Sequence, residues 1–156
     1  MTEPTTPLEP DTRNSLIDYP SDFPIKIMGP THAHFAHTMI EVVRQFEPEL
    51  LIISAGYDAH WRDPLGRMGL TVGGFAALAA EVKQWAGQLC EGRLVVLMEG
   101  GYDLEALAAS LAATVEVLLG RPVDDRLGPS PYHEPMPAVE EAIAAARQAL
   151  APYWTF

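Results

Sequence analysis

Two uninterrupted apolar runs, each followed by a glycine motif, constrain the fold more than any other feature of the sequence. Residues 50–54 (LLIIS) precede the motif AGYDAH, and residues 94–98 (LVVLM) precede the motif EGGYD. Such runs are typical of strands buried on both faces of a parallel sheet. Because ligands of open α/β sheets bind beyond the carboxyl ends of the strands, Asp58 and Tyr102 are expected to face the same sheet edge.

Helical periodicity surrounds these two strands. Helices are predicted from Thr31 to the residues before Pro48, after a Thr71 cap, after an Asp103 cap, and over residues 137–150. The third helix is expected to bury a stripe made of Leu104, Leu107, Ala108, Leu111, Val115, Leu118 and Leu119. The order helix, strand, helix, strand, helix, loop, helix predicts an α/β fold with a right-handed crossover.

The sheet predicted from this sequence is incomplete. Strands buried on both faces need neighbours, and two parallel strands are rarely stable alone. Residues 1–30 carry six prolines and no sustained periodicity, so they are interpreted as a lead-in that is irregular or partly disordered. Residues 31–156 are therefore interpreted as one part of a larger sheet domain.

Composition excludes some classes of function. A net charge of −11, with only 10 Lys and Arg, argues against a nucleic-acid backbone or an anionic membrane as partner. The single cysteine, Cys90, excludes an internal disulfide and is expected to be a buried structural thiol. Without a signal peptide or an apolar stretch of membrane-spanning length, the expected location is the cytoplasm.

The polar residues after the first strand are candidates for both functional and structural roles. Asp58 can bind a metal, act as a base or cap the next segment, and Asp58-Ala59-His60 resembles a chelating pair. Asp63, in the turn Asp63-Pro64-Leu65-Gly66, is expected to accept hydrogen bonds from backbone amides. A metal site made by His32, His34 and His37 is disfavoured, because only two of the three share a helical face and no acidic ligand is adjacent.

The second motif is equally open on local grounds. Gly100 and Gly101 allow a close backbone approach or a positive φ that presents Tyr102 to a cleft. The same pair can also form a tight turn into a helix, with Tyr102 covering the core.

Taken together, the motifs resemble the zinc-dependent histone deacetylase superfamily, in particular its bacterial histone deacetylase-like and acetylpolyamine amidohydrolases and acetoin-utilisation proteins. The resemblance rests on residues 48–60, the DPLG turn at 63–66, Leu70-Thr71, and residues 98–104. It extends from about Gly29 to the last helix. It implies an arginase-like α/β fold and hydrolysis of an acetyl-amide, with acetylated lysine or polyamine as substrate.

The resemblance also implies roles for individual residues. Asp58 matches the family's second aspartate ligand of zinc, and Tyr102 matches the tyrosine whose hydroxyl binds the substrate carbonyl. Leu65 falls where the family lines the acyl channel, and Gly100 and Gly101 shape the wall beside Tyr102. His60 belongs to the motif but is not a ligand in the family.

The sequence also departs from the family. Nothing in residues 1–57 matches the family's general-base histidine pair or the Asp-x-His segment that supplies the other two zinc ligands. The chain is therefore expected to correspond to the C-terminal half of a deacetylase, inactive alone. Three interpretations remain open: the product of a truncated reading frame, one half of a two-chain enzyme that needs the missing N-terminal half, or a non-catalytic interaction module.

Overall fold

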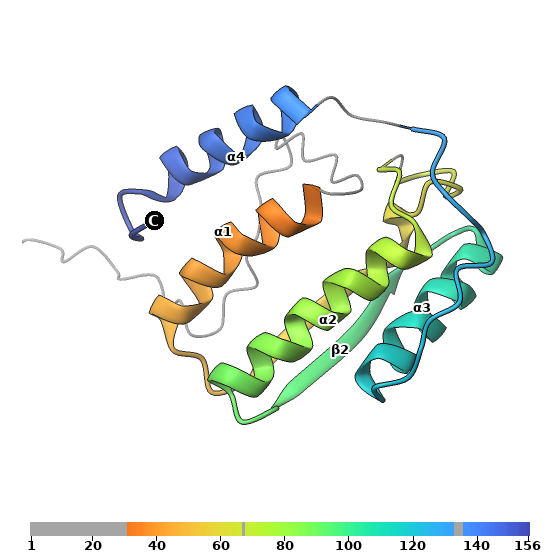
Figure 1. Ribbon diagram of the computed structural model, residues 1–156, viewed down its shortest axis with the longest axis horizontal. Coiled ribbons are helices and arrows are strands. Elements are labelled where there is room, and N and C mark those ends of the chain that lie inside the picture. Colours follow the sequence, from red (N-terminus) through yellow and green to blue (C-terminus); the bar gives the residue numbers. More distant parts are fainter. Residues whose placement is uncertain (1–30, 67, 133–135) are drawn as a thin grey trace, which may run out of the picture.

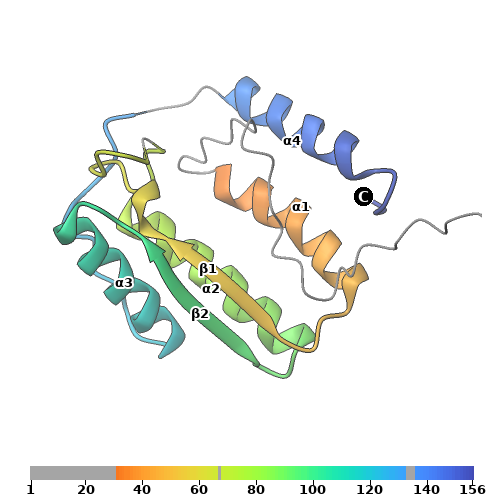
Figure 2. The same cartoon turned by 180° about the vertical axis from the view of Figure 1, so that it is seen from behind.

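The described part of the chain contains a two-stranded parallel sheet with helices packed on one side of it (Figures 1 and 2). The computed structural model describes residues 31–66, 68–132 and 136–156, with residues 31–37 and 136–139 described as backbone only. Strand β1 spans Leu51–Gly56 and strand β2 spans Leu94–Gly100. Both predicted strands are thus confirmed, while the predicted lead-in of residues 1–30 lies outside the described residues.

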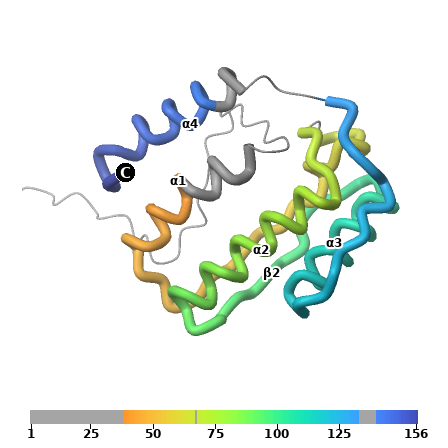
Figure 3. Tube along the Cα trace, viewed as in Figure 1, coloured from red at the N-terminus to blue at the C-terminus, as the bar shows by residue number. Residues whose placement is uncertain are grey.

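The helices follow the predicted order. They are α1 (Thr31–Phe46), α2 (Val72–Leu89), α3 (Leu104–Leu118) and α4 (Met136–Leu150), with a short 3₁₀ helix, η1 (Tyr57–Ala59), directly after β1. Helix α2 makes the crossover between the two strands and lies across one face of the sheet (Figure 1). Helices α1 and α3 pack on opposite flanks of α2, and α4 packs along α1 (Figure 3).

The caps that define two of these helices are those expected from the sequence. The Thr71 hydroxyl accepts a hydrogen bond from the backbone N–H of Gly74 at 3.0 Å, at the start of α2. The Asp103 carboxylate accepts one from Ala106 at 2.9 Å, at the start of α3. Each cap satisfies a backbone donor that the first helical turn leaves unpaired.

Only one face of the sheet is covered in the described part of the chain. Figure 2 shows β1 and β2 from the side opposite α2, with none of the described helices lying across them. Ile52, Val95 and Leu97 alternate onto this face and are 52%, 40% and 50% exposed. The strands carry apolar residues for two covered faces, as predicted, but α2 covers only one of them.

The core lies where the carboxyl end of β1 meets α2 and α3. It is built from Tyr57, Leu70 and Phe75, with partly buried Ala55, Ala59, Leu78, Leu107 and Leu111 packed around them. The Tyr57 hydroxyl donates a hydrogen bond to the Thr114 hydroxyl on α3 at 3.1 Å. This core anchors η1, and η1 carries Asp58.

The predicted apolar stripe of α3 is wrong at its ends. Its central residues Leu107 and Leu111 join the core, but Leu104, Val115 and Leu119 are 78%, 44% and 57% exposed. The buried face consists instead of Ala106, Ser110, Ala113 and Thr114. These small side chains let α3 approach its neighbours closely, and Leu104, Val115 and Leu119 of the predicted stripe then point away from the contact.

The buried thiol expected at Cys90 is confirmed. Its side chain is fully buried at the C-terminal end of α2, and its sulfur donates a hydrogen bond to the Pro48 carbonyl at 3.2 Å. Burial raises the pKa of the Cys90 thiol, against the opposing charge of Arg93. A thiol in this state is protonated and packs as a small apolar side chain.

Candidate metal and substrate site

The carboxyl ends of β1 and β2 lie side by side and carry both motifs. The strands pair in register from Leu51 opposite Leu94 to Ala55 opposite Met98, after which the register shifts and Gly56 lies opposite Gly100. An extra residue, Glu99, is thereby accommodated on β2. Such irregularities turn the side chains that follow, and they are common beside active sites.

Asp58 lies directly against the end of β2. A Cβ atom added to Gly100 would lie 3.0 Å from the Asp58 Cγ and Oδ1 atoms and 3.1 Å from Oδ2. A Cβ at Gly56 would lie 2.8 Å from Asp58 Oδ1. The two glycines therefore leave the space that the Asp58 carboxylate occupies between the strands.

The Asp58 carboxylate is half-buried and available to a ligand. Within residues 31–66, 68–132 and 136–156, no hydrogen bond or ion pair involves it, so the capping alternative finds no support there. A carboxylate oxygen is a donor that zinc accepts, and this one fits a metal ligand. In the part of the chain that the structure describes, no three His, Cys, Asp or Glu side chains gather into a complete metal site.

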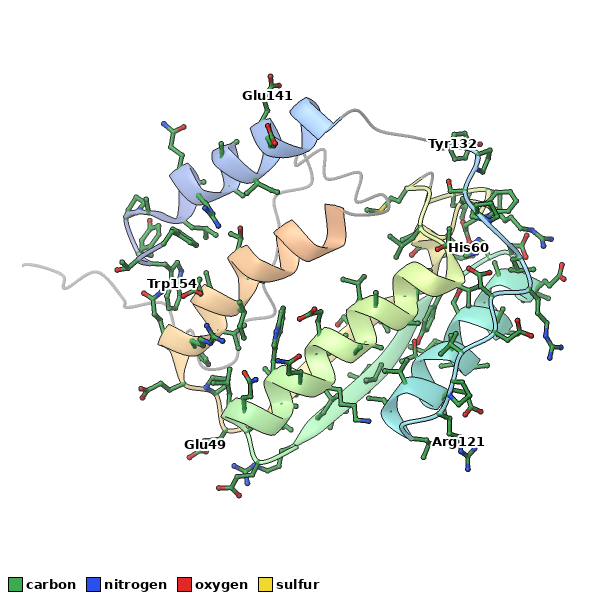
Figure 4. All side chains as sticks on the ribbon, viewed as in Figure 1. Glu49, His60, Arg121, Tyr132, Glu141 and Trp154 are labelled. Carbon is green, nitrogen blue, oxygen red and sulfur yellow. The ribbon has the colours of Figure 1, made fainter. Side chains whose placement is uncertain are left out.

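His60 is not placed as a chelating partner of Asp58. It is fully buried, its Nδ1 accepts the backbone N–H of Arg62 at 3.1 Å, and its ring stacks on Phe75 with 6.4 Å between centroids. Figure 4 shows it near the N-terminal end of α2. Burial lowers the pKa of His60, against the opposing charges of Asp125 and Asp103, which favours the neutral imidazole.

Tyr102 is exposed rather than packed into the core. Its side chain is 57% exposed in the loop between β2 and α3, and this exposure contradicts the alternative in which Tyr102 covers the core. Gly101 before it has φ of 138°, a conformation that favours glycine, and a Cβ there would lie 2.8 Å from Leu107 Cδ1. The lack of a side chain at Gly100 thus leaves room for Asp58, and the positive φ of Gly101 directs the backbone into the loop that carries Tyr102.

Leu65 lies in a turn that is tied to the same end of the sheet. Its side chain is 65% exposed at the tip of the segment between η1 and α2. The base of this segment is closed by backbone hydrogen bonds from Leu70 to Ala59 at 2.9 Å and from Trp61 to Leu70 at 2.8 Å. Leu65 is therefore an exposed apolar side chain on a pinned loop.

Asp63 joins the two loops. Its Oδ1 accepts the N–H of Leu65 and its Oδ2 accepts the N–H of Tyr102, at 2.8 and 2.7 Å. The sequence predicts the first of these contacts, a local turn bond, but not the second, which spans 39 residues. No spacing rule along one segment could have found it.

The side chains of His32, His34 and His37 lie outside the described residues, so the interpretation of these three histidines stays a prediction.

The parallel strands and the crossover helix define an α/β domain, and its likeness to solved histone deacetylase domains identifies the fold as arginase-like. A family model described as "Histone deacetylase domain" matches residues 29–118. This chain belongs to the histone deacetylase family.

Known relatives agree with that assignment and are longer than this chain. "Histone deacetylase 10, chloroplastic" of Oryza sativa subsp. japonica is 40% identical over 116 residues, 72% of this chain and 26% of the relative. "Polyamine deacetylase HDAC10" of Homo sapiens is 40% identical over 122 residues, 78% of this chain and 17% of the relative. The matched part of the chain thus corresponds to about a quarter or less of these relatives.

Solved structures show the same relationship. The crystal structure of the HDA15 HD domain aligns with a TM-score of 0.62 at 31% identity, covering 80% of this chain and 31% of that one. The histone deacetylase Clr3 aligns with a TM-score of 0.65 at 27% identity, covering 80% and 20%.

Among the described helices, none has both the length and the hydropathy needed to cross a membrane.

Proposed function

We propose that this chain contributes one zinc ligand and the carbonyl-binding tyrosine to a deacetylase that hydrolyses acetyl-amides. The observation that carries the proposal is the Asp58 carboxylate, which has no hydrogen bond or ion pair among the described residues and lies against Gly100, two residues before the exposed Tyr102. The relatives named histone deacetylase and polyamine deacetylase support acetylated lysine or acetylated polyamine as the substrate class. The acidic chain, with a net charge of −11, suits a substrate that keeps positive charge beside the acetyl-amide, such as an acetylated polyamine or a basic peptide.

Each residue has a defined task in this proposal. Asp58 would hold the metal and offset part of its charge. Zinc, when bound, supplies Lewis-acid activation of water and of the acetyl carbonyl. The Tyr102 hydroxyl would donate a hydrogen bond to the carbonyl oxygen as negative charge develops on it. Leu65 would contact the apolar stem of the acylated side chain.

The proposal requires groups beyond those described here. A catalytic zinc usually has three protein ligands, and Asp58 supplies one. The general base and the remaining ligands are proposed to come from a further deacetylase segment, on the same polypeptide or on another. The 156-residue chain alone is expected to bind zinc weakly and to leave acetyl-lysine peptides intact.

Complementation tests the proposal. The chain is mixed, or fused, with the N-terminal segment of a related deacetylase, and hydrolysis of an acetyl-lysine peptide and of an acetylpolyamine is measured. Activity should appear and should need zinc. Asp58→Asn should lower zinc occupancy and activity together, because it removes the charged ligand.

Tyr102→Phe is the sharper variant. It should lower kcat by roughly 10²–10³-fold with little change in KM, as expected for one hydrogen-bond donor acting in the transition state. Tyr132→Phe is a matched control, because Tyr132 is also exposed, at 58%, and lies in the loop after α3. Activity that survives Tyr102→Phe, or zinc-dependent turnover by the chain alone, would contradict the assignment.

A further inference from the structure

We propose that Asp63 is a positioning residue that fixes Tyr102 relative to the Leu65 turn, so that the two loops form one braced wall of the substrate site. The statement that these loops line a substrate site rests on the proposed function. The connection between the two loops through Asp63 is tested without any measurement of catalysis.

The Asp63 carboxylate divides its two oxygens between two loops. Oδ1 accepts the backbone N–H groups of Leu65 at 2.8 Å and Gly66 at 3.2 Å. Oδ2 accepts those of Tyr102 at 2.7 Å and Asp103 at 3.3 Å. One buried group, 6% exposed, thereby holds both the turn that carries Leu65 and the backbone of Tyr102.

The chemistry of this contact requires an ionised carboxylate. All four partners are N–H donors, so a group that only accepts hydrogen bonds satisfies every one of them. Asn in the same place would turn an N–H₂ donor toward two of these N–H groups. Asp63→Asn therefore keeps the size of the side chain but replaces an acceptor by a donor and removes the negative charge. Asp63→Glu keeps the charge but shifts its position.

Two further contacts make the brace specific to this pair of loops. The neighbouring Arg62 places Nε 3.3 Å from Asp103 Oδ2, and a terminal nitrogen 2.9 Å from Glu105 Oε2. Gly66 packs so closely on the backbone of η1 that a Cβ atom there would overlap the Asp58 carbonyl oxygen. The turn is thus held to Asp58 on one side and to Tyr102 on the other.

A positioning role makes a distinctive kinetic prediction. If Asp63 affects the reaction by holding the Tyr102 hydroxyl in position, Asp63→Asn should lower kcat of the complemented enzyme by about tenfold or more, with a smaller change in KM. In the Tyr102→Phe background the same substitution should cost little further kcat. A merely structural role would lower kcat by the same factor in both backgrounds.

Amide hydrogen exchange and nitrogen–proton correlation spectra test the brace in the chain itself. Asp63→Asn should speed exchange at Leu65, Gly66, Tyr102 and Asp103 together, by about tenfold or more, while amides within α2 keep their protection. If Asp63→Asn does not fold, Asp63→Glu is used, and it should shift the Leu65 and Tyr102 resonances together.

Asp125→Asn is the matched control. Asp125 also accepts several backbone N–H groups, from Gly73 at 3.0 Å, Leu127 at 3.2 Å and Gly128 at 3.0 Å, without bonding to the Tyr102 loop. It should leave Tyr102 exchange and kcat near wild type.

The outcomes separate the two proposals. Changes confined to the Leu65 turn, with Tyr102 unmoved, would overturn the positioning role of Asp63. Equal kcat losses in the wild-type and Tyr102→Phe backgrounds would overturn it as well. A complemented enzyme without activity would refute the proposed function alone, because the exchange result would still decide whether Asp63 joins the loops.

Discussion

Gly66 and Gly87 have different surroundings, and the same substitution should have opposite effects at the two positions. A Cβ at Gly66 would overlap the backbone of Asp58, whereas one at Gly87, within α2, would meet no atom of the described residues within 4 Å. Gly66→Ala should lower the free energy of unfolding by about 1–3 kcal/mol, the usual range for overpacking. Gly87→Ala should raise it by roughly 0.5–1 kcal/mol, through helix propensity. Urea denaturation measures both, and equal effects would contradict the close packing at Gly66.

Asp63 should also make stability depend on acid pH. Burial alone would raise the pKa of Asp63, but the backbone hydrogen bonds from Tyr102, Leu65, Gly66 and Asp103 outweigh it and lower the pKa below its ordinary value of 3.8. The folded state therefore binds this proton less readily than the unfolded chain. The resulting stabilisation is complete above pH 3.8 and is lost as the pH falls through the folded pKa.

Urea unfolding measured between about pH 2 and pH 6 tests this sign. Wild type should lose stability on acidification, and Asp63→Asn should lose less over the same interval, because it has no proton to gain. Asp125→Asn is compared in parallel. An identical slope in wild type and Asp63→Asn would contradict the lowered pKa.

The residues of the candidate site were predictable to different degrees. The strand-end rule indicated that Asp58 and Tyr102 would face one edge, and turn chemistry indicated that Asp63 would bond to nearby amides. The bond from Tyr102 to Asp63 depends on how two distant loops pack, and local spacing carries no information about that. The seat of Asp58 against Gly100 depends on the register shift between Ala55 and Gly56, which the sequence pattern does not reveal either.

Helix α2 begins at a cap whose contribution can be measured. Thr71→Ala removes the acceptor of the Gly74 N–H and should lower the free energy of unfolding by about 1 kcal/mol. Thr71→Ser keeps the hydroxyl and should stay close to wild type. If Ser and Ala cost the same, the hydroxyl does not act as a cap.

Helices and strands were more predictable than their faces. Apolar periodicity, Thr71 and Asp103 located the elements because caps and strand runs are local signals. The local sequence did not determine which face of α3 is buried, because both its leucine-rich and its alanine-rich sides are apolar. The contacts with α2 and η1 selected the small side chains, leaving Leu104 and Leu119 exposed.

At the scale of the whole molecule, the described part of the chain leaves apolar surface uncovered on the sheet face opposite α2. Ile52, Val95 and Leu97 contribute to it from two adjacent strands. Contiguous apolar surface of this kind is typical of a face that contacts another polypeptide, a membrane or a ligand. A deacetylase segment that adds strands and covers this face remains the prediction made from the incomplete sheet.

Leu97 and Val96 offer a test of which face is open. Leu97→Lys, on the face that the described helices leave uncovered, should change the free energy of unfolding by no more than about 0.5 kcal/mol in urea denaturation. Val96→Lys, at a partly buried position on the face that α2 covers, should lower the free energy of unfolding much more, because it places an unpaired charge against α2. Similar losses of stability in both variants would contradict the one-sided sheet.

The buried thiol of Cys90, hydrogen-bonded to Pro48, makes local opening of the chain measurable by thiol labelling. Because the thiol is fully buried where the end of α2 meets the start of β1, a thiol reagent reaches the sulfur only when that junction opens. At high reagent concentration, the labelling rate becomes the opening rate itself; at low concentration, it reports the equilibrium population of the open form. The single cysteine thus lets both quantities be measured without introducing a probe.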